Sequence, residues 1–233
     1  MIIKSLELRS IPYEIKDTKS LKISISVKNN GTIIIKKNKL FSNEKVIEFV
    51  DNHIDWIEKA YLKNYIPPRK YITGEEYLLL GKTYHLNLVY DNLDTIEVDF
   101  DHLIIIIHTS STVIKHIDKL MNSYLSKLSN EVFTILFEKA LNNIQTYLEI
   151  RPKFFIKQYK SRWGCCIPKE NKIILNKSLI HVDLDLILYV IYHELCHFKY
   201  LNHSPLFHQF LSLFVPNEKE MKKRLNKFSP EYR

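Results

Sequence analysis

Residues 184–208 read LDLILYVIYHELCHFKYLNHSPLFH, the most specific pattern in the chain. Residues 184–200 contain neither glycine nor proline and are mostly apolar, which predicts a buried helix. His193 and His197 would lie one turn apart on one face of that helix, with Cβ atoms about 5–6 Å apart. Two imidazoles in this arrangement can bind one Zn²⁺ at about 2.0–2.1 Å each. Glu194, beside the first histidine, can then reach a metal-bound water.

A third zinc ligand is expected just after this helix. The helix should end around Leu201, with Asn202 in the left-handed conformation that often closes a helix. Ser204-Pro205 is typical of an N-cap residue followed by proline in the first turn of a new helix. His203 falls in the tight turn between the two helices, where its imidazole can fold back toward the first pair. The sequence therefore predicts His203 as the third ligand and an open fourth position for water.

Three other interpretations of these residues stay open. The histidines could be core residues with satisfied hydrogen bonds, but this leaves Glu194 unexplained, because an unpaired buried carboxylate is costly. Catalysis could use Glu218 or Glu220 as the third ligand. A purely structural zinc would instead need a fourth protein ligand, for which the chain offers Cys165, Cys166, Cys196 and His208.

These motifs resemble those of the YgjP-like metallopeptidases, which are related to the SprT-like and WLM zinc proteases. The family pattern is R-W-G-S-C, a short strand ending in L-N, then H-E-L-x-H and N-H-S-x-x-F-W. The front half of the chain is also similar to the family. The matching segments of this chain are Trp56-Ile57, Gly81-Lys82-Thr83-Tyr84, Arg162-Trp163-Gly164-Cys165-Cys166, Ile174-Leu175-Asn176, His193–His197 and Asn202–His208. The resemblance implies a zinc peptidase with His193, His197 and His203 as ligands and Glu194 as the base.

Two positions depart from the family pattern. Cys165 stands where the pattern has serine, a change that we expect to leave catalysis intact. His208 stands where the pattern has tryptophan. A histidine beside the site could compete for the metal or bind substrate, or it could be an ordinary, partly exposed helix residue.

The chain as a whole predicts strands first and helices later. Alternation over Leu21–Val27 and a β-branched run over Thr32–Ile35 predict two strands, and a helix follows from about Ser42. Residues 71–108 predict four more strands, and a long helical pattern runs from about Ser111 to about Leu148. We therefore expect an α+β fold. It consists of a β-rich N-terminal region with one helix, residues 1–108, and a mostly helical, zincin-like metallopeptidase domain with a short sheet, residues 109–233.

Basic residues suggest a second kind of partner. The formal net charge is +8, which fits either an anionic partner such as nucleic acid or a background bias toward lysine. Residues 151–163 contain five basic residues, no acidic ones and interleaved aromatics, a pattern that suits phosphate contact and base stacking. The alternative is an amphipathic strand with a solvated lysine face. The candidate nucleic-acid contacts are Lys153, Lys157 and Lys160.

Cysteine usage and hydropathy predict the compartment. Three cysteines, two of them adjacent, do not form a disulfide framework and suggest reducing surroundings. The N-terminus lacks the apolar core of a signal peptide, and no apolar run approaches the ~20 residues that span a bilayer. We expect a cytoplasmic protein without a membrane partner.

The predicted activity is hydrolysis of peptide bonds in a peptide or protein substrate, by a Zn²⁺-activated water with Glu194 as general base. Contacts to the substrate or the oxyanion are expected from Arg162, Tyr200 or His208. The substrate could add as a strand along an exposed edge such as Lys172–Leu175, unless this strand belongs to the core sheet. The alternatives are a nucleic-acid-associated binding module with a structural zinc site and a protease that acts on DNA-bound proteins.

Overall fold

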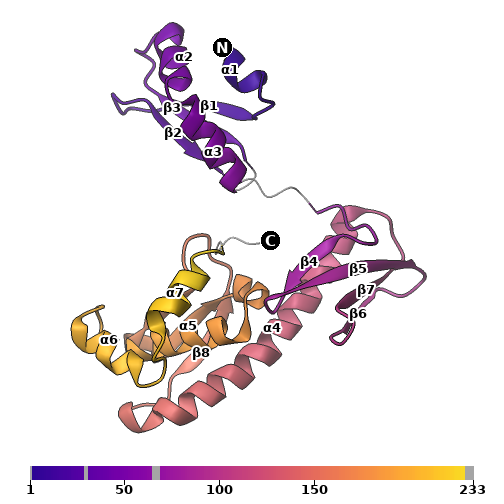
Figure 1. The fold of residues 1–233 in the computed structure, drawn as a ribbon, viewed down its shortest axis with the longest axis vertical. Coiled ribbons are helices and arrows are strands. Elements are labelled where there is room, and N and C mark those ends of the chain that lie inside the picture. Colours follow the sequence, from indigo (N-terminus) through magenta and orange to yellow (C-terminus); the bar gives the residue numbers. More distant parts are fainter. Residues whose placement is uncertain (1, 29–30, 65–68, 229–233) are drawn as a thin grey trace. The chain divides into compact units, whose positions relative to one another are not determined.

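The computed structural model describes residues 2–28, 31–64 and 69–228 of the chain (Figure 1). Helices and three small sheets, each containing both parallel and antiparallel pairs, make it an α+β protein, which confirms the predicted class. The chain forms two compact units, Met1–Arg69 and Lys70–Arg233. In the described ranges, no helix is long and apolar enough to cross a membrane.

The N-terminal unit is built on a three-stranded sheet of order β1-β3-β2. The central strand runs parallel to β1 and antiparallel to β2. Its inward side chains, with those of the helices, form a separate small hydrophobic core. The elements of this unit are α1 (Lys4–Glu7), β1 (Tyr13–Asp17), β2 (Ser24–Val27), β3 (Ile33–Lys37), α2 (Asn43–Asp51) and α3 (Ile54–Asn64).

The helix predicted from about Ser42 begins as expected but is broken in the middle. The Ser42 hydroxyl accepts a hydrogen bond from the main-chain N–H of Lys45 at 3.3 Å, as an N-cap should. The apolar periodicity continues through Asn52-His53, where the chain leaves the helix and starts α3. Periodicity alone could not detect this break, because both helices present apolar faces to the same core. The sequence Pro67-Pro68, which should stop any helix before it, lies outside the described residues.

The C-terminal unit contains a four-stranded sheet, a long helix and a second, three-stranded sheet with its own helices. The four-stranded sheet has the order β4-β5-β7-β6 and the three-stranded one β8-β10-β9. The elements of this unit are β4 (Glu76–Leu79), β5 (Lys82–Tyr90), β6 (Thr95–Asp99), β7 (Ile104–Thr109), α4 (Ile114–Ile144), η1 (Gln145–Tyr147), β8 (Lys153–Lys157), β9 (Gly164–Ile167), η2 (Pro168–Glu170), β10 (Lys172–Asn176), η3 (Lys177–His181), α5 (Leu184–Cys196), α6 (Pro205–Ser212) and α7 (Glu218–Leu225).

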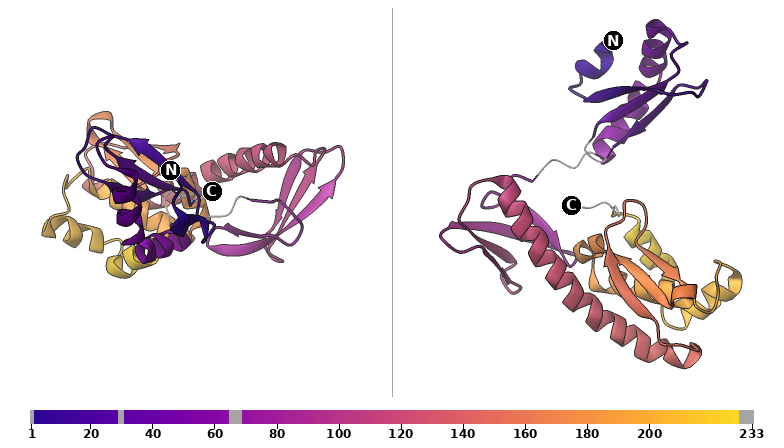
Figure 2. Two further views of the ribbon diagram at one scale, coloured as in Figure 1. Left: turned by 90° about the horizontal axis from the view of Figure 1, so that it is seen from above. Right: turned by 180° about the vertical axis from the view of Figure 1, so that it is seen from behind.

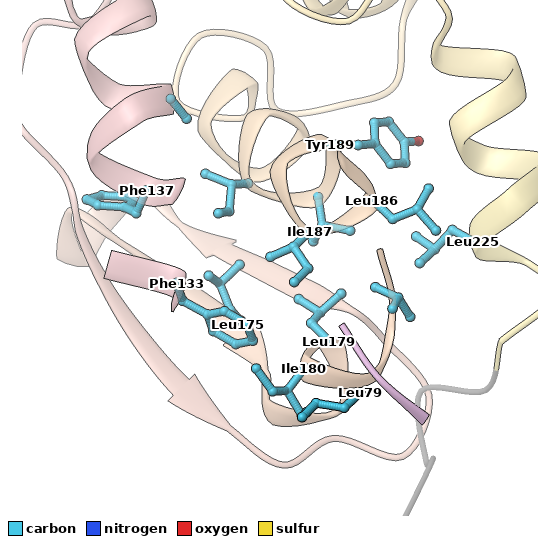
Figure 3. Close-up of a cluster of buried hydrophobic side chains, with 14 of the residues drawn as sticks. Leu79, Phe133, Phe137, Leu175, Leu179, Ile180, Leu186, Ile187, Tyr189 and Leu225 are labelled. Atoms are coloured by element: carbon cyan, nitrogen blue, oxygen red, sulfur yellow. The ribbon is translucent and has the colours of Figure 1, made fainter. Parts of the chain in front are cut away.

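Helix α4 connects the two sheets of this unit and packs against both β6 and α5 (Figure 2). Its buried residues recur mostly at intervals of four, which places them on one side of the helix. They meet the apolar side chains of α5, β10 and η3 in one core, part of which Figure 3 shows. Burial of this kind stabilises the unit by about 1.5–3 kcal/mol for each large apolar side chain. The buried positions of α4 are Ile117, Met121, Leu125, Ser129, Phe133, Phe137, Ala140, Leu141 and Ile144.

The β4–β5 hairpin explains why the compact units divide at Arg69/Lys70. The domain boundary expected between residues 108 and 109 lies instead inside the second unit, Lys70–Arg233. The hairpin turn docks on the segment before α5, where the N–H of Leu80 donates to the carbonyl of Ile180 at 2.8 Å. A Cβ atom on Gly81 would lie 2.6 Å from Cγ of Asp183, so only glycine fits there. Residues 70–108 therefore share a core with the C-terminal helices, a long-range association that composition does not reveal.

The order of strands in the sheet β8-β10-β9 contradicts one prediction made from the sequence. The strand β10 is central, with β8 parallel on one side and β9 antiparallel on the other. The proposed substrate edge at Lys172–Leu175 is therefore wrong, because both edges of this strand are already paired. Among the described strands, β8 and β9 are the outer strands of this sheet. The short strand β9 was not predicted from the sequence.

Candidate metal centre

Helix α5 carries the first two histidines and is buried along most of its length. It ends at Cys196, five residues before the predicted end at Leu201, and His197 is its C-cap residue. Tighter turns follow, in which Phe198 N–H donates to the carbonyl of Leu195 at 3.1 Å. Asn202 does not adopt the predicted left-handed conformation. His193 and His197 nevertheless lie one turn apart, with ring centroids separated by 5.1 Å.

His203 reaches the same place from the turn before α6. Ser204 is the N-cap residue of that helix, with its hydroxyl accepting from Phe207 N–H at 3.4 Å, and Pro205 follows in the first turn, as predicted. The Nε2 atoms of His203 and His193 are 2.9 Å apart. The donor atoms of His193, His197 and His203 all lie within 4.8 Å of one another. Three imidazoles from two segments thus converge on one point.

The chemistry of this donor set fits a divalent metal ion. The Nδ1 atom of His197 contacts the carbonyl of Tyr200 at 3.0 Å, and donation of its proton leaves Nε2 with a free lone pair. Burial, followed by the nearby His197 and His203, lowers the pKa of His193 to about 3. The imidazole of His193 is therefore neutral at physiological pH, the form that binds Zn²⁺.

Phe207 forms an aromatic support behind all three histidines. It is fully buried, and its ring centroid lies 5.0 Å from that of His193, 4.7 Å from that of His197 and 4.9 Å from that of His203. The Nδ1 atom of His193 is buried and has no hydrogen-bond partner among the described residues. The orientation of this ring therefore depends on packing against Phe207 and Tyr189. This role of Phe207 was not predicted from the sequence, although the residue lies in the N-H-S-x-x-F pattern.

Glu194 is buried against the edge strand β9. Glu194 is only 7% exposed, and burial raises the pKa of its carboxyl to about 7. Two contacts lower this pKa and partly offset the effect of burial. The main-chain N–H of Cys166 donates to the carboxylate, and the positive charge of Arg162 favours the ionised form. A Cβ atom on Gly164 would lie 2.6 Å from Oε1 of Glu194. The strand therefore approaches the carboxylate so closely that only glycine leaves room for it.

Asn176 anchors the loop that leads into β9. Its side-chain amide donates to the carbonyls of Arg162 and Tyr159 at 2.8 and 3.0 Å, and its oxygen accepts from the N–H of Ser178 at 3.1 Å. The side chain is fully buried. Asn176 thus joins β10 to the segment that carries Arg162 and Gly164. Asn176 is the asparagine of the L-N pattern, and this anchoring role was not predicted from the sequence.

We expect Asn176→Ala to destabilise the unit by about 1–3 kcal/mol, because two main-chain carbonyls lose the hydrogen bonds that the buried Asn176 amide donates. Urea denaturation followed by circular dichroism measures this change. Asn142→Ala is the matched control, since Asn142 is exposed on α4 and alanine favours a helix. Equal stability of the two variants would contradict the anchoring role.

The other residues considered as metal ligands lie outside the triad. Among the described residues, no cysteine or carboxylate joins the three histidines in a group that could hold an ion. His208 is paired through Nδ1 with the carboxylate of Glu218 at 2.9 Å, and its ring centroid is 6.3 Å from that of His203. Burial raises the pKa of the Cys166 and Cys196 thiols to about 12. A closed four-ligand site and a glutamate third ligand are therefore not supported by this geometry.

The candidate contacts to substrate and to nucleic acid lie outside the histidine triad. Arg162 is exposed and lies over the ring of Tyr159 at 5.7 Å. Tyr200 contributes its carbonyl to His197 and packs its ring against Phe210 at 5.7 Å. The predicted nucleic-acid contacts Lys153, Lys157 and Lys160 are all exposed, the first two on β8.

A helix with His193, Glu194 and His197, completed by a histidine from the next turn, is the arrangement of a metallopeptidase. The model of the YgjP-like metallopeptidase domain matches residues 21–228. The chain therefore belongs to the YgjP-like metallopeptidase family, as its motifs suggested.

Two solved structures are also similar to the chain. The metallopeptidase zymogen abylysin of Pyrococcus abyssi is 26% identical over 40% of this chain and 90% of that one, with a TM-score of 0.36. The zymogen jannalysin of Methanocaldococcus jannaschii is 24% identical over 41% of this chain and 94% of that one, with a TM-score of 0.37. A comparison with curated proteins finds no match.

Proposed function

We propose that the chain is a zinc-dependent peptidase in which His193, His197 and His203 hold the metal and Glu194 is the general base. The observation that carries the proposal is the convergence of three imidazoles with no fourth ligand group among the described residues. Three protein ligands and an open position are typical of a catalytic zinc, whereas a structural zinc has four.

The chemistry would be divided between the metal and the protein. Bound Zn²⁺ would acidify a water molecule and polarise the scissile carbonyl. The Glu194 carboxylate would accept the proton of the attacking water and deliver it to the leaving amine. A carboxyl whose pKa is raised toward neutrality by burial suits both steps. Arg162 and His208 are proposed as contacts to the substrate or the oxyanion, because both are exposed near the site.

The free edge of β9 is the proposed place for the substrate main chain. No described strand pairs with the other edge of β9, and the N–H of Cys166 on that edge contacts Glu194. An extended peptide added to this edge would pass directly beside the carboxylate. This location replaces the edge at Lys172–Leu175, which pairing within the sheet excludes.

The metal test uses the purified full-length chain. We expect one zinc per chain by elemental analysis, cleavage of an unfolded protein such as casein, and loss of cleavage on chelation with recovery on adding zinc. His203→Ala should lose bound zinc and activity together, because two imidazoles alone are an incomplete site. His102→Ala is the matched control, since His102 is exposed in the turn between β6 and β7 and pairs with Asp99.

Two results would reject this proposal. Zinc bound as tightly by His203→Ala as by the wild type would exclude His203 as a ligand. Tight zinc binding by a wild type that cleaves no protein or peptide substrate would favour the structural-zinc module instead. A nucleic-acid partner and an action on DNA-bound proteins stay predictions, which added DNA and a salt series would test in the same assay.

A further inference from the structure

The free edge of β8 borders a groove that the proposed catalytic site does not use. Two adjoining hollows of about 410 and 380 Å³ lie along this strand and share Phe154 and Phe155. Helix α4 supplies the opposite wall, with Ser126 and Asn130 in one hollow and Phe137 and Glu138 in the other. In the described part of the chain, β8 pairs only with β10, so its outer edge is open to this groove.

The main chain of β8 offers a regular row of donors and acceptors. The N–H of Lys153 donates to the carbonyl of Asn171 at 2.9 Å, toward β10. Because neighbouring residues in a strand point their polar groups to opposite sides, the N–H and C=O groups of Phe154 and Ile156 face the open edge. The five residues of β8 span about 16 Å. This row has the spacing that another β-strand requires.

The side chains around this edge are apolar and basic. Phe155 is 47% exposed, between the exposed Lys153 and Lys157 on the same face of the sheet. Lys177 lines the C-terminal part of the groove. The acidic residue in the lining, Glu138, is already paired with Arg151 at 2.5 Å. The groove therefore combines an exposed aromatic ring with Lys153 and Lys157, for which the described residues supply no salt bridge.

We propose that the edge of β8 binds an extended, acidic segment of a partner protein, which adds to the sheet as a fourth strand. Main-chain hydrogen bonds to Phe154 and Ile156 would supply affinity, and carboxylates opposite Lys153 and Lys157 would supply selectivity. Apolar residues at the alternate positions of the segment would point to the other face of the sheet, toward Phe154 and Phe137.

A peptide strand fits the hydrogen-bonding groups and charge of this edge better than a nucleic acid or a second copy of the chain does. Phosphate oxygens of a nucleic acid could accept from the lysines, but they cannot donate to the open carbonyls of Phe154 and Ile156. A second copy of the chain paired through β8 would place lysines opposite lysines, which is destabilising. An acidic strand meets both requirements.

This surface is distinct from the proposed substrate edge. The strands β8 and β9 are the two outer strands of the sheet, with β10 between them, and their centres are therefore about 10 Å apart. Glu194 lies against β9. Binding at β8 thus does not depend on zinc or on peptidase activity.

The test uses the full-length Glu194→Gln chain, so that peptides are not cleaved, and a fluorescein-labelled octapeptide of alternating glutamate and valine. We expect saturable binding by fluorescence anisotropy. Hydrogen exchange should show protection of residues 152–158 and no protection of 163–167. The double variant Lys153→Glu/Lys157→Glu should weaken binding roughly tenfold or more. The matched control is Lys115→Glu/Lys119→Glu, two exposed lysines near the start of α4, which should bind normally.

Two methylated peptides separate strand addition from simple charge attraction. One carries N-methyl groups on the glutamates and the other on the valines. We expect only one of them to lose binding, because alternate amides of an added strand face β8. Equal binding of both peptides, or protection at 163–167 instead of 152–158, would overturn the proposal. Displacement of the peptide by oligo(dT) at a lower concentration than by unlabelled peptide would also overturn it, in favour of nucleic acid.

Discussion

Glu194→Gln should lower kcat for protein cleavage by about 10²–10⁴-fold, because glutamine cannot accept a proton from the attacking water. The substitution preserves the size and shape of the side chain, so zinc content should stay at the wild-type value. Elemental analysis and a cleavage assay on the same preparations measure both quantities. Glu149→Gln is the matched control, since Glu149 is exposed after η1 and far along the chain from the site.

The same variant has a predictable effect on stability. In the metal-free protein, burial raises the pKa of Glu194 to about 7 from its ordinary value of 4.5. Since the folded-state pKa lies above the unfolded one, this group lowers stability as the pH rises from 4.5 to 7, and the cost is complete above 7. Metal-free Glu194→Gln should therefore melt at least as high as metal-free wild type at pH 8. A variant that keeps cleavage near the wild-type rate would exclude Glu194 as the base.

If Glu194 is the base, Gly164→Ala should lower kcat by about 10²-fold while leaving zinc bound, because its Cβ would meet the carboxylate of Glu194. That atom would lie 2.6 Å from Oε1, 2.7 Å from Cγ and 2.9 Å from Cδ of Glu194. These distances are too short for carbon and oxygen atoms in contact, so either the side chain of Glu194 or the strand β9 must move. The histidines come from α5 and from the turn before α6, and they have no direct dependence on Gly164.

Cys165→Ser provides the matched control for this prediction. Cys165 is the next residue of β9, and its side chain points to the opposite face of the sheet from Gly164. Serine is similar in size, and the resemblance to the family pattern indicates that it is compatible with the strand. The control should keep both zinc and activity. If Gly164→Ala also kept full activity at unchanged zinc content, the close approach of β9 would have no role in placing the base.

The metal-binding pattern was predictable because it depends on local geometry. The spacing of His193 and His197 places them one turn apart on any helix, wherever that helix packs. Ser204 and Pro205 define the start of the next helix through interactions within one turn. The same reasoning found the main strands and α4 to within a few residues, since hydrophobic periodicity reports which face each element buries.

Other features could not be predicted because they depend on contacts between distant segments. The close approach of Gly164 to Glu194, the anchoring of the β9 loop by Asn176 and the docking of Gly81 on Asp183 each join residues more than ten positions apart. The order of strands decides that β10 is central and that β8 and β9 have free edges. Local pattern therefore determines which residues can ligate a metal. Only the packing of the whole unit determines which strand lies against Glu194 and which strand edges are left unpaired. The reason is that strand pairing depends on the collective burial of side chains from every element.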